Sequence, residues 1–432
     1  MLKSRLCIAF FAFAVGCAPA QKPLTDYVNP MLGTATLWDS VDLGFKPTKR
    51  TWGAEVFPGS SLPNAMVQVS PVTKFHSGAG YQYEDSVIYG FTHTNKGHWN
   101  LCHIPLLPVT GTPTPGDYCS PFSHERESAA PGYYQVFLDR YGVDAQLSST
   151  LRCAFHKYTY PAGAAASLLA DLQRSNEHVR AWDIRKEGDN VFAGWQQTGE
   201  KMYFYAVANR PVTGIEPVVE GDREVRIVRF GEGDGALELR IGFSFVSEKN
   251  ARENLEAEML GKSFAEVRSE ATATWNDLLG RIRVEGGTER EKGLFYSSLY
   301  RSFLWPALRS DVNGEFTDVD GKVINPGFRY YTGPSYWDDY RNKLILLGML
   351  APDVAADVIS SDTDKGEKRG GFMPTFFHGD HASAFVAGTY LRGNRGFDVN
   401  RAYNLVLRNA TVQGPSRPWL DEYIAKGYIS EM

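Results

Sequence analysis

The 432-residue sequence has few cysteines and no concentration of positive charge. Its net charge is −5 and it contains no basic run, which argues against nucleic acid as a partner. It has no Gly-x-Ser-x-Gly, Walker or dinucleotide motif, and no Cys/His spacing typical of a zinc site. Aromatic residues are abundant at 13%, beside 43% hydrophobic and 22% charged residues. This composition indicates a globular protein with a large β-sheet core, a carbohydrate cleft, or both.

The five cysteines limit covalent cross-linking. After removal of an N-terminal signal three remain, Cys102, Cys119 and Cys153, so at most one disulfide can form. Cys102 and Cys119 are the nearest pair in the sequence. The favoured alternative is three buried thiols that act as small apolar residues.

The first twenty residues predict an export signal. Lys3 and Arg5 precede a short apolar stretch, and Ala18-Pro19-Ala20 offers a cleavage site. The slightly favoured form is a bacterial lipoprotein signal, in which Cys17 would carry the lipid anchor. No other segment has the length and apolarity of a membrane span. We therefore expect export to the periplasm or outer-membrane surface of a Gram-negative bacterium.

Alternation of apolar and polar residues dominates from about residue 24 to 260. It is visible in 134–138, 224–228 and 237–241, and glycine-rich turns separate such runs. Short strands without β-α-β alternation predict an antiparallel sandwich. Ser263 and Glu266 form a capping box, and from there on the apolar residues recur at helical spacing.

The second half predicts helices over 289–308, 337–350, 380–391 and 398–409. A sandwich followed by successive helices is typical of an (α/α)6 toroid, but the predicted helices are too few to close the ring. The predicted fold is therefore an antiparallel β-sandwich followed by a partial (α/α)6 toroid, with the chain ending inside the barrel domain. We expect a signal in 1–20, a sandwich domain in 21–261, a linker helix in 262–285 and an incomplete barrel in 286–432.

The segment 331–341 carries the most chemistry. Asp338, Asp339 and Arg341 lie among four aromatic residues that include Trp337. Carboxylates and guanidinium groups hydrogen-bond sugar hydroxyls, and an indole face stacks on a pyranose ring. The alternative is that both aspartates favour the positive end of the following helix.

Two further segments leave two interpretations open. Residues 90–94 and 97–99 bring His93, His98 and Trp99 into one loop. These residues either have a structural role or form the rim of a sugar-binding site. Asp380 and His381 lie at the predicted start of a helix. Either Asp380 caps that helix, or both side chains face a cleft.

Residues 311–321 resemble a calcium loop but fail the EF-hand pattern, because Phe316 replaces the required glycine and no glutamate closes the loop. We predict instead a β-hairpin with its turn at Asn313-Gly314.

Together, eight segments resemble glycoside hydrolase family 92, the exo-acting α-mannosidases. They occur in order at 26–34, 57–71, 80–83, 90–94, 131–134, 295–301, 337–341 and 379–381. The resemblance runs from about Asp26 to the end of the chain.

This resemblance implies a β-sandwich on an (α/α)6 barrel, and calcium-dependent removal of terminal α-linked mannose with inversion. One carboxylic acid would protonate the leaving oxygen and a second carboxylate would activate water, about 6.5–9.5 Å apart. It also implies candidates for the terminal mannose subsite: Trp337, Asp338, Asp339, Arg341, His93, His98 and Trp99, with Asp380 and His381 as weaker ones.

The chain departs from the family pattern at the catalytic motifs. The family's general acid lies in a Gly-Asn-Glu-Pro motif and its base in a Gly-Asn-Asp or Gly-Asp-Asp motif, and neither occurs in this sequence. We therefore assign neither catalytic role to a residue of this chain, and we expect most calcium ligands to be absent as well. The chain is expected to be a truncated, monomeric and inactive form of an exported α-mannosidase. The substrate would be mannans or N-glycans, with α-1,2 linkages favoured. The alternatives are a mannose-binding protein without catalysis and a sandwich-plus-toroid glycoside phosphorylase.

Overall fold

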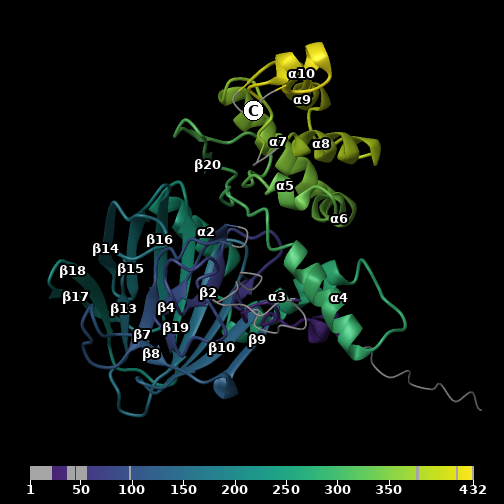
Figure 1. Ribbon diagram of the computed structural model, residues 1–432. Coiled ribbons are helices and arrows are strands. Elements are labelled where there is room, and N and C mark those ends of the chain that lie inside the picture. Colours follow the sequence, from purple (N-terminus) through teal and green to yellow (C-terminus); the bar gives the residue numbers. More distant parts are fainter. Residues whose placement is uncertain are drawn as a thin grey trace, which may run out of the picture.

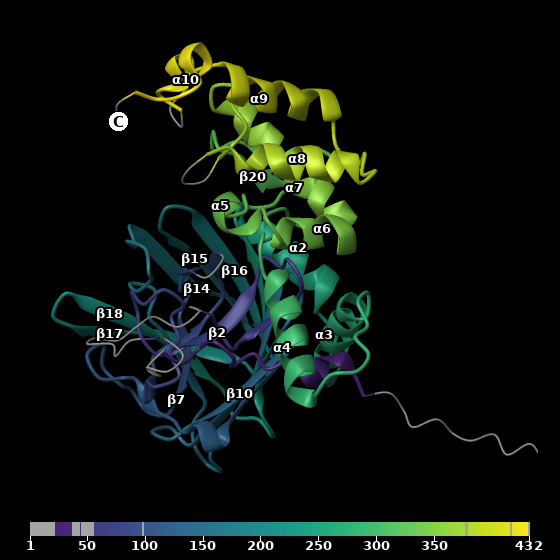
Figure 2. The same ribbon diagram turned by 45° about the vertical axis from the view of Figure 1, so that its right-hand side comes forward.

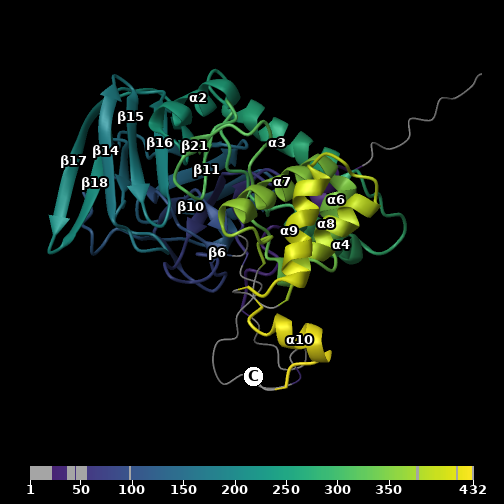
Figure 3. The ribbon, with the colours of Figure 1, turned by 90° about the horizontal axis from the view of Figure 1, so that it is seen from above.

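Two antiparallel sheets pack against each other in the first half of the chain, and helices make up the second half (Figures 1 and 3). The computed structural model describes residues 22–36, 44, 56–96, 99–375, 379–414 and 417–430. The predicted sandwich followed by helices is confirmed. The predicted signal segment and Cys17 lie outside the described residues.

The first sheet has seven strands and the second has eight, and every ladder is antiparallel. Strand β16 shows why they form, because its residues alternate between buried and half-buried positions along their whole length. In spatial order the first sheet comprises β1 (Ser60–Ser61), β2 (Gln68–Val72), β4 (Gly90–Thr92), β7 (Leu106–Val109), β13 (Ser167–Ala170), β18 (Arg223–Phe230) and β17 (Val212–Glu220). The second comprises β14 (Ala181–Gly188), β15 (Val191–Gln197), β16 (Lys201–Ala208), β19 (Leu237–Ser244), β12 (Cys153–Thr159), β11 (Val143–Ser149), β10 (Tyr133–Leu138) and β9 (Glu127–Ala130).

Three short ladders and two 3-10 turns complete the β half and the loop beside it. One of the ladders is the hairpin predicted near residue 314, but its position differs from the prediction. The strands flank residues 318–322, because the Asp318 carboxylate accepts the backbone N–H groups of Asp320 and Lys322 and closes that turn. The ladders are β3 (Val87–Ile88) with β8 (Ser120–Pro121), β5 (Asn95–Lys96) with β6 (Trp99–Asn100) and β20 (Phe316–Thr317) with β21 (Val323–Ile324); the turns are η1 (Leu24–Tyr27) and η2 (His124–Arg126).

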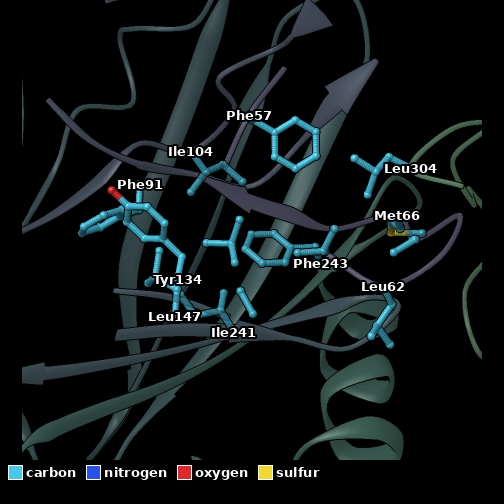
Figure 4. Close-up of a cluster of buried hydrophobic side chains, with 14 of the residues drawn as sticks. Phe57, Leu62, Met66, Phe91, Ile104, Tyr134, Leu147, Ile241, Phe243 and Leu304 are labelled. Atoms are coloured by element: carbon cyan, nitrogen blue, oxygen red, sulfur yellow. The ribbon is translucent and has the colours of Figure 1, made fainter. Parts of the chain in front are cut away.

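Apolar side chains of both sheets meet in one core. Phe91 of the first sheet and Tyr134, Ile241 and Phe243 of the second are fully buried there, and Leu304, which follows α4, joins them (Figure 4). The same cluster continues into the helices as far as Leu405. The two halves therefore share a continuous apolar interior.

The helices differ from the prediction in several places; α10 was not predicted, and the helix expected over 289–308 ends at Ser302. Helix α2 lies in the region expected to be strand, where Ala251 and Leu255 form only a narrow buried stripe on a polar helix. Helix α7 was not predicted, and small residues supply much of its buried face. The expected helix over 337–350 is two helices. The helices are α2 (Glu248–Glu258), α3 (Phe264–Leu279), α4 (Glu289–Ser302), α5 (Tyr336–Asp339), α6 (Lys343–Leu350), α7 (Pro352–Lys368), α8 (His381–Leu391), α9 (Val399–Thr411) and α10 (Leu420–Lys426).

No single helix among the described residues is long and apolar enough to cross a membrane; α6 and α7 reach that length only together, with a bend of 119° between them. The three cysteines in the described part of the chain are free thiols, with Cys102 and Cys153 buried and Cys119 half-buried. The pairing of Cys102 with Cys119 is therefore wrong, and the expectation of buried thiols holds for the other two.

Two polar side chains at the edge of the first sheet fix the segment that leads to the second half. The Asn64 amide donates to Pro306 O (2.8 Å), and its backbone N–H donates to Phe303 O (2.6 Å). The Gln68 amide donates to Leu304 O (2.7 Å). These buried hydrogen bonds set where residues 303–308 leave the sandwich, and thereby where residues 331–341 begin.

Candidate functional site

The carboxylate–arginine segment comprises helix α5, which contains Asp338 and Asp339, and the turn after it, which contains Arg341. The backbone of α5 is set by Ser335, whose carbonyl accepts the N–H groups of Asp338 (2.8 Å) and Asp339 (2.9 Å). The next helix, α6, starts separately, with the Asn342 side chain accepting from Lys343 N (2.7 Å). Because Asn342 caps α6, the two aspartates do not cap that helix; they lie in the first turn of α5 instead, where negative charge favours the positive end of a helix.

Three of the four predicted side chains in this segment face solvent. Trp337 is 47% exposed, and Asp338 and Arg341 are exposed as well. Within the described part of the chain the Asp338 carboxylate forms no hydrogen bond or ion pair, whereas Arg341 Nε donates to the Tyr340 hydroxyl (3.0 Å). An indole, a carboxylate and a guanidinium group are thus accessible within five consecutive residues, which is a set that can bind sugar hydroxyls and stack on a sugar ring.

The fourth predicted residue, Asp339, is buried. Its carboxylate pairs with Lys343 Nζ (3.2 Å), one turn further along the chain. Burial raises the pKa of Asp339 above its ordinary value, although the positive charge of Lys343 opposes this shift. Asp339 therefore ties α5 to α6 and is not exposed to a ligand in the way that Asp338 is.

Tyr340 brings two predicted segments together. Its ring stacks on that of His381, with centroids 4.1 Å apart and planes 12° apart, and the guanidinium of Arg341 lies 5.0 Å from the Tyr340 ring centroid. His381 follows Arg341 by 40 positions in the sequence, so only the packing of α5 against α8 makes them neighbours. Sequence reasoning included Tyr340 only as one of the aromatic residues, and its spacing gave no signal of this role.

Asp380 is a helix cap. Its carboxylate accepts from Ser383 N (3.3 Å) at the start of α8, and it also pairs with Arg417 (3.1 Å) and accepts from the Asn409 amide (3.3 Å). With three protein partners, Asp380 has little capacity left for a ligand. The cap interpretation is confirmed.

A buried network beneath α5 was missed by sequence reasoning. The Tyr336 hydroxyl donates to Asp362 on α7 (2.5 Å), and Lys365 Nζ donates to the same carboxylate and to Tyr331 O (2.9 Å each). Tyr336 and Asp362 are buried, and burial raises the pKa of Tyr336 well above its ordinary value. The network clamps both ends of residues 331–336 onto α7, which positions the exposed side chains that follow.

His93 lies in the sandwich core. It is fully buried, its Nε2 is 3.0 Å from Nε2 of His156, and its ring lies 4.6 Å from that of Phe243. Burial lowers the pKa of His93 to about 3, so the ring is neutral at ordinary pH. This placement corrects the sugar-binding interpretation of His93 in favour of a structural histidine. His98 and the side chain of Trp99 lie outside what the structure describes.

The described side chains do not assemble a metal site. No three His, Cys, Asp or Glu side chains within them are grouped so as to hold a metal ion. Asp311, in the segment that resembles a calcium loop, is instead buried and accepts from Ser244 and Asn254 (2.7 Å each). Because calcium needs six to eight oxygen ligands, these residues do not by themselves fit a calcium site.

Comparison with known proteins gives matches along nearly the whole chain. Residues 27–253 match the glycosyl hydrolase family 92 N-terminal domain, and residues 250–432 match the family 92 catalytic domain. A curated relative, an uncharacterized secreted glycosidase of Arthroderma benhamiae, is 24% identical over 93% of this chain and 55% of its own length.

Solved structures agree with this assignment. A family GH92 α-mannosidase from Bacteroides thetaiotaomicron superposes with a TM-score of 0.83 at 26% identity, covering 93% of this chain and 58% of that one. An inverting family GH92 mannosidase from strain VPI-5482 of the same species shares the fold, with a TM-score of 0.82 at 24% identity over 95% of this chain and 59% of that one. The chain spans a little over half the length of these relatives.

Proposed function

The chain belongs to glycosyl hydrolase family 92, and from this membership we propose that it forms the sugar-contacting part of an exo-acting α-mannosidase. One observation carries the proposal: Trp337 and Asp338 on the clamped helix α5, and Arg341 in the turn after it, are accessible beside the stacked rings of Tyr340 and His381. The solved structure at 26% identity is of an α-mannosidase, which supports mannose as the sugar.

In this proposal each exposed group has one task. Asp338 accepts hydrogen bonds from two adjacent hydroxyls of a terminal mannose, and Arg341 donates to one of its oxygens. Trp337 stacks on the apolar face of the ring. The Tyr336–Asp362–Lys365 network holds these groups in place, so less conformational freedom is lost on binding.

Hydrolysis with inversion needs an acid and a base that this sequence does not supply in the family's motifs. We propose that the whole enzyme removes terminal α-linked mannose, preferably α-1,2, from mannans or N-glycans, and that this 432-residue chain alone does not. Calcium belongs to the proposal for the whole enzyme, where it would help to distort the sugar ring, and the ligands named above do not provide its site.

Export is part of the same proposal. The basic and apolar N-terminal residues support it, and the fungal relative is named as a secreted glycosidase. A lipid anchor at Cys17 and a location in the periplasm or on the outer-membrane surface remain the expected forms. The anchor and this location would give the protein access to extracellular glycans.

The test compares sugar binding with sugar release. Saturation-transfer NMR of methyl α-mannoside with this chain is expected to show binding that Trp337→Ala and Asp338→Asn each abolish. Trp419→Ala is the matched control, because Trp419 is 43% exposed against 47% for Trp337. Equal loss of the signal in Trp419→Ala and Trp337→Ala would contradict the proposed site.

The second measurement is mannose release from α-1,2-mannobiose with calcium present. We expect none from this chain. Release that depends on Asp338 would mean that the catalytic groups are within the 432 residues, and our assignment of Asp338 to binding would be wrong.

A further inference from the structure

A separate hollow lies between α3 and the outer face of the eight-stranded sheet. It has a volume of about 620 Å³, and polar side chains line much of it: Gln146, Lys157, Arg268, Ser269, Thr272 and Asn276. Figures 1 and 2 show α3 along the sandwich, whereas α5 lies among the upper helices. No acidic residue is part of the lining.

Two cations in this hollow are held by aromatic rings and not by carboxylates. The Arg268 guanidinium carbon lies 3.6 Å from the ring centroid of Tyr133, and Lys157 Nζ lies 5.7 Å from that of Phe264. The two rings are in edge contact, with centroids 6.2 Å apart. Neither cation forms an ion pair with any residue that the structure describes. Stacking orients the guanidinium while leaving its N–H donors without carboxylate acceptors.

Two acidic residues of the sheet beside the hollow have other partners. Glu238 is opposite Lys157 in the β12–β19 ladder, but its carboxylate pairs with Arg240 (3.2 Å). The Asp144 carboxylate keeps its charge and accepts hydrogen bonds from the neutral amides of Gln135 (2.7 Å) and Gln146 (2.8 Å). Neither carboxylate pairs with Arg268 or Lys157, so both cations remain without an acidic partner among the described residues.

Arg252, an arginine of α2, provides the contrast. Arg252 lies over the ring of Tyr205, at 5.8 Å from its centroid, on the same sheet. Its Nε bonds to Glu256 one helical turn away (2.7 Å), which neutralises it. Arg252 and Arg268 thus share a ring contact and differ in whether a carboxylate is bound.

We propose that the hollow beside α3 is a binding site for an acidic glycan, a sugar chain that bears carboxylate or sulfate groups. Arg268 and Lys157 would bind the oxyanion, and the hydroxyl and amide groups of Ser269 and Gln146 would bind ring hydroxyls. That the ligand is a glycan rests on the proposed function, whereas its negative charge rests on the hollow alone. The site would retain the enzyme on its polysaccharide while the segment at α5 meets the chain end.

The test measures binding of the full chain to polygalacturonate, dextran sulfate and uncharged dextran by biolayer interferometry, at low and high salt. We expect binding to the carboxylated or sulfated polymer, none to dextran, and loss of affinity as salt screens the charges. Arg268→Gln and Lys157→Gln should each weaken binding about three- to tenfold, the effect of one charge-assisted contact.

Arg252→Gln should leave binding unchanged, and thermal melts check that all variants fold. Equal weakening by Arg252→Gln, or no binding to either acidic polymer, would overturn the proposal. So would binding only to vesicles of phosphatidylserine and phosphatidylcholine, since the occupant would then be a membrane. Trp337→Ala is expected to leave acidic-glycan binding intact, so failure at this hollow and failure at the mannose site are distinguishable.

Discussion

The sandwich and the last helices bury apolar surface in different ways. In the sandwich, the inner faces of two sheets cover each other, and Phe91, Leu147 and Phe243 are fully buried. Among α8–α10, large apolar side chains remain in contact with solvent: Leu391 is 80% exposed, and Ile424 is 57% exposed. The two sheets therefore bury their inner faces against each other, whereas these helices bury only one side, although one apolar cluster connects the two halves.

Helix geometry explains the contrast. In α9, Ala402 and Leu405 face the core, while Tyr403 and Leu407 on other faces are exposed. A helix with apolar residues on more than one face needs neighbours on more than one side. Each exposed face costs roughly 25 cal/mol per Å² of apolar surface left wet. We therefore expect this chain, expressed alone, to aggregate through α8–α10.

The largest expected effect tests the core of the sandwich. Phe243→Ala should lower the free energy of unfolding by about 3–5 kcal/mol, because it leaves a cavity in a closed core. Tyr403→Ala on α9 is the matched change in the helices, and since Tyr403 is 58% exposed it should cost under about 0.5 kcal/mol. Urea denaturation followed by circular dichroism measures both. Similar losses in the two variants would remove the contrast between the halves.

The next effect concerns pH at the joint between the halves. Burial raises the pKa of Asp311 to about 6 from its ordinary 3.8, so the folded state holds a proton that the unfolded state has released between these values. Stability should fall by roughly 3 kcal/mol as pH rises from 4 to 6, and then level off. Asp311→Asn should flatten this slope.

Asp357 on α7 is the counterpart in the helices. Burial raises its pKa to about 6 as well, but the side chain is only half-buried and solvent screens it. Asp357→Asn should therefore flatten the pH dependence less than Asp311→Asn does. The free energy of unfolding, measured at several pH values for both variants, tests this expectation. A larger effect of Asp357→Asn than of Asp311→Asn would mean that the main pH-sensitive group lies in the helices.

A smaller effect is expected for the clamp beneath α5. Tyr336→Phe removes the donor to the buried Asp362 carboxylate and should cost about 1–3 kcal/mol. Tyr340→Phe removes only the exposed contact with Arg341 and should cost far less. Methyl α-mannoside binding by NMR should weaken in Tyr336→Phe. Unchanged stability there would mean that the network does not position the segment.

The smallest effect on stability, and the sharpest on aggregation, is expected at Leu391. Leu391→Glu should change the unfolding free energy by under about 0.5 kcal/mol, because the residue is already exposed, while light scattering should show less association. Leu405→Glu is the control, since its buried side chain should make the change strongly destabilising. If Leu391→Glu destabilises as much, the exposed face is in fact packed.

Patterns in the sequence were sufficient wherever one local feature decided the structure. Alternation predicted β10, β18 and β19, and the Ser263–Glu266 capping box predicted the start of α3. They failed where tertiary contacts decided. Helix α2 is polar and is held by the sheet it covers, and Asn342 caps a separate helix inside the segment 337–350 that was predicted as one helix.

The candidate site divides along the same line. The residues Trp337, Asp338 and Arg341 were identifiable because an aromatic–carboxylate–arginine run is chemically distinctive. The residues that hold this run in place were not identifiable, since nothing in the sequence indicates that Asp362 and Lys365 bind a segment some thirty residues earlier. His93 shows the converse, because its sequence context fits a binding rim and its burial makes it part of the core.

Neighbouring positions in the chain were enough to predict the order of sandwich and helices, the family, and which short run bears sugar-binding chemistry, because alternation, helical period and residue type are local properties. The three-dimensional packing was needed to learn which of those residues face solvent, that Tyr340 joins Arg341 to His381, and that Arg268 and Lys157 share a hollow. Burial and charge pairing depend on contacts between distant parts of the chain, and no single stretch of sequence encodes them.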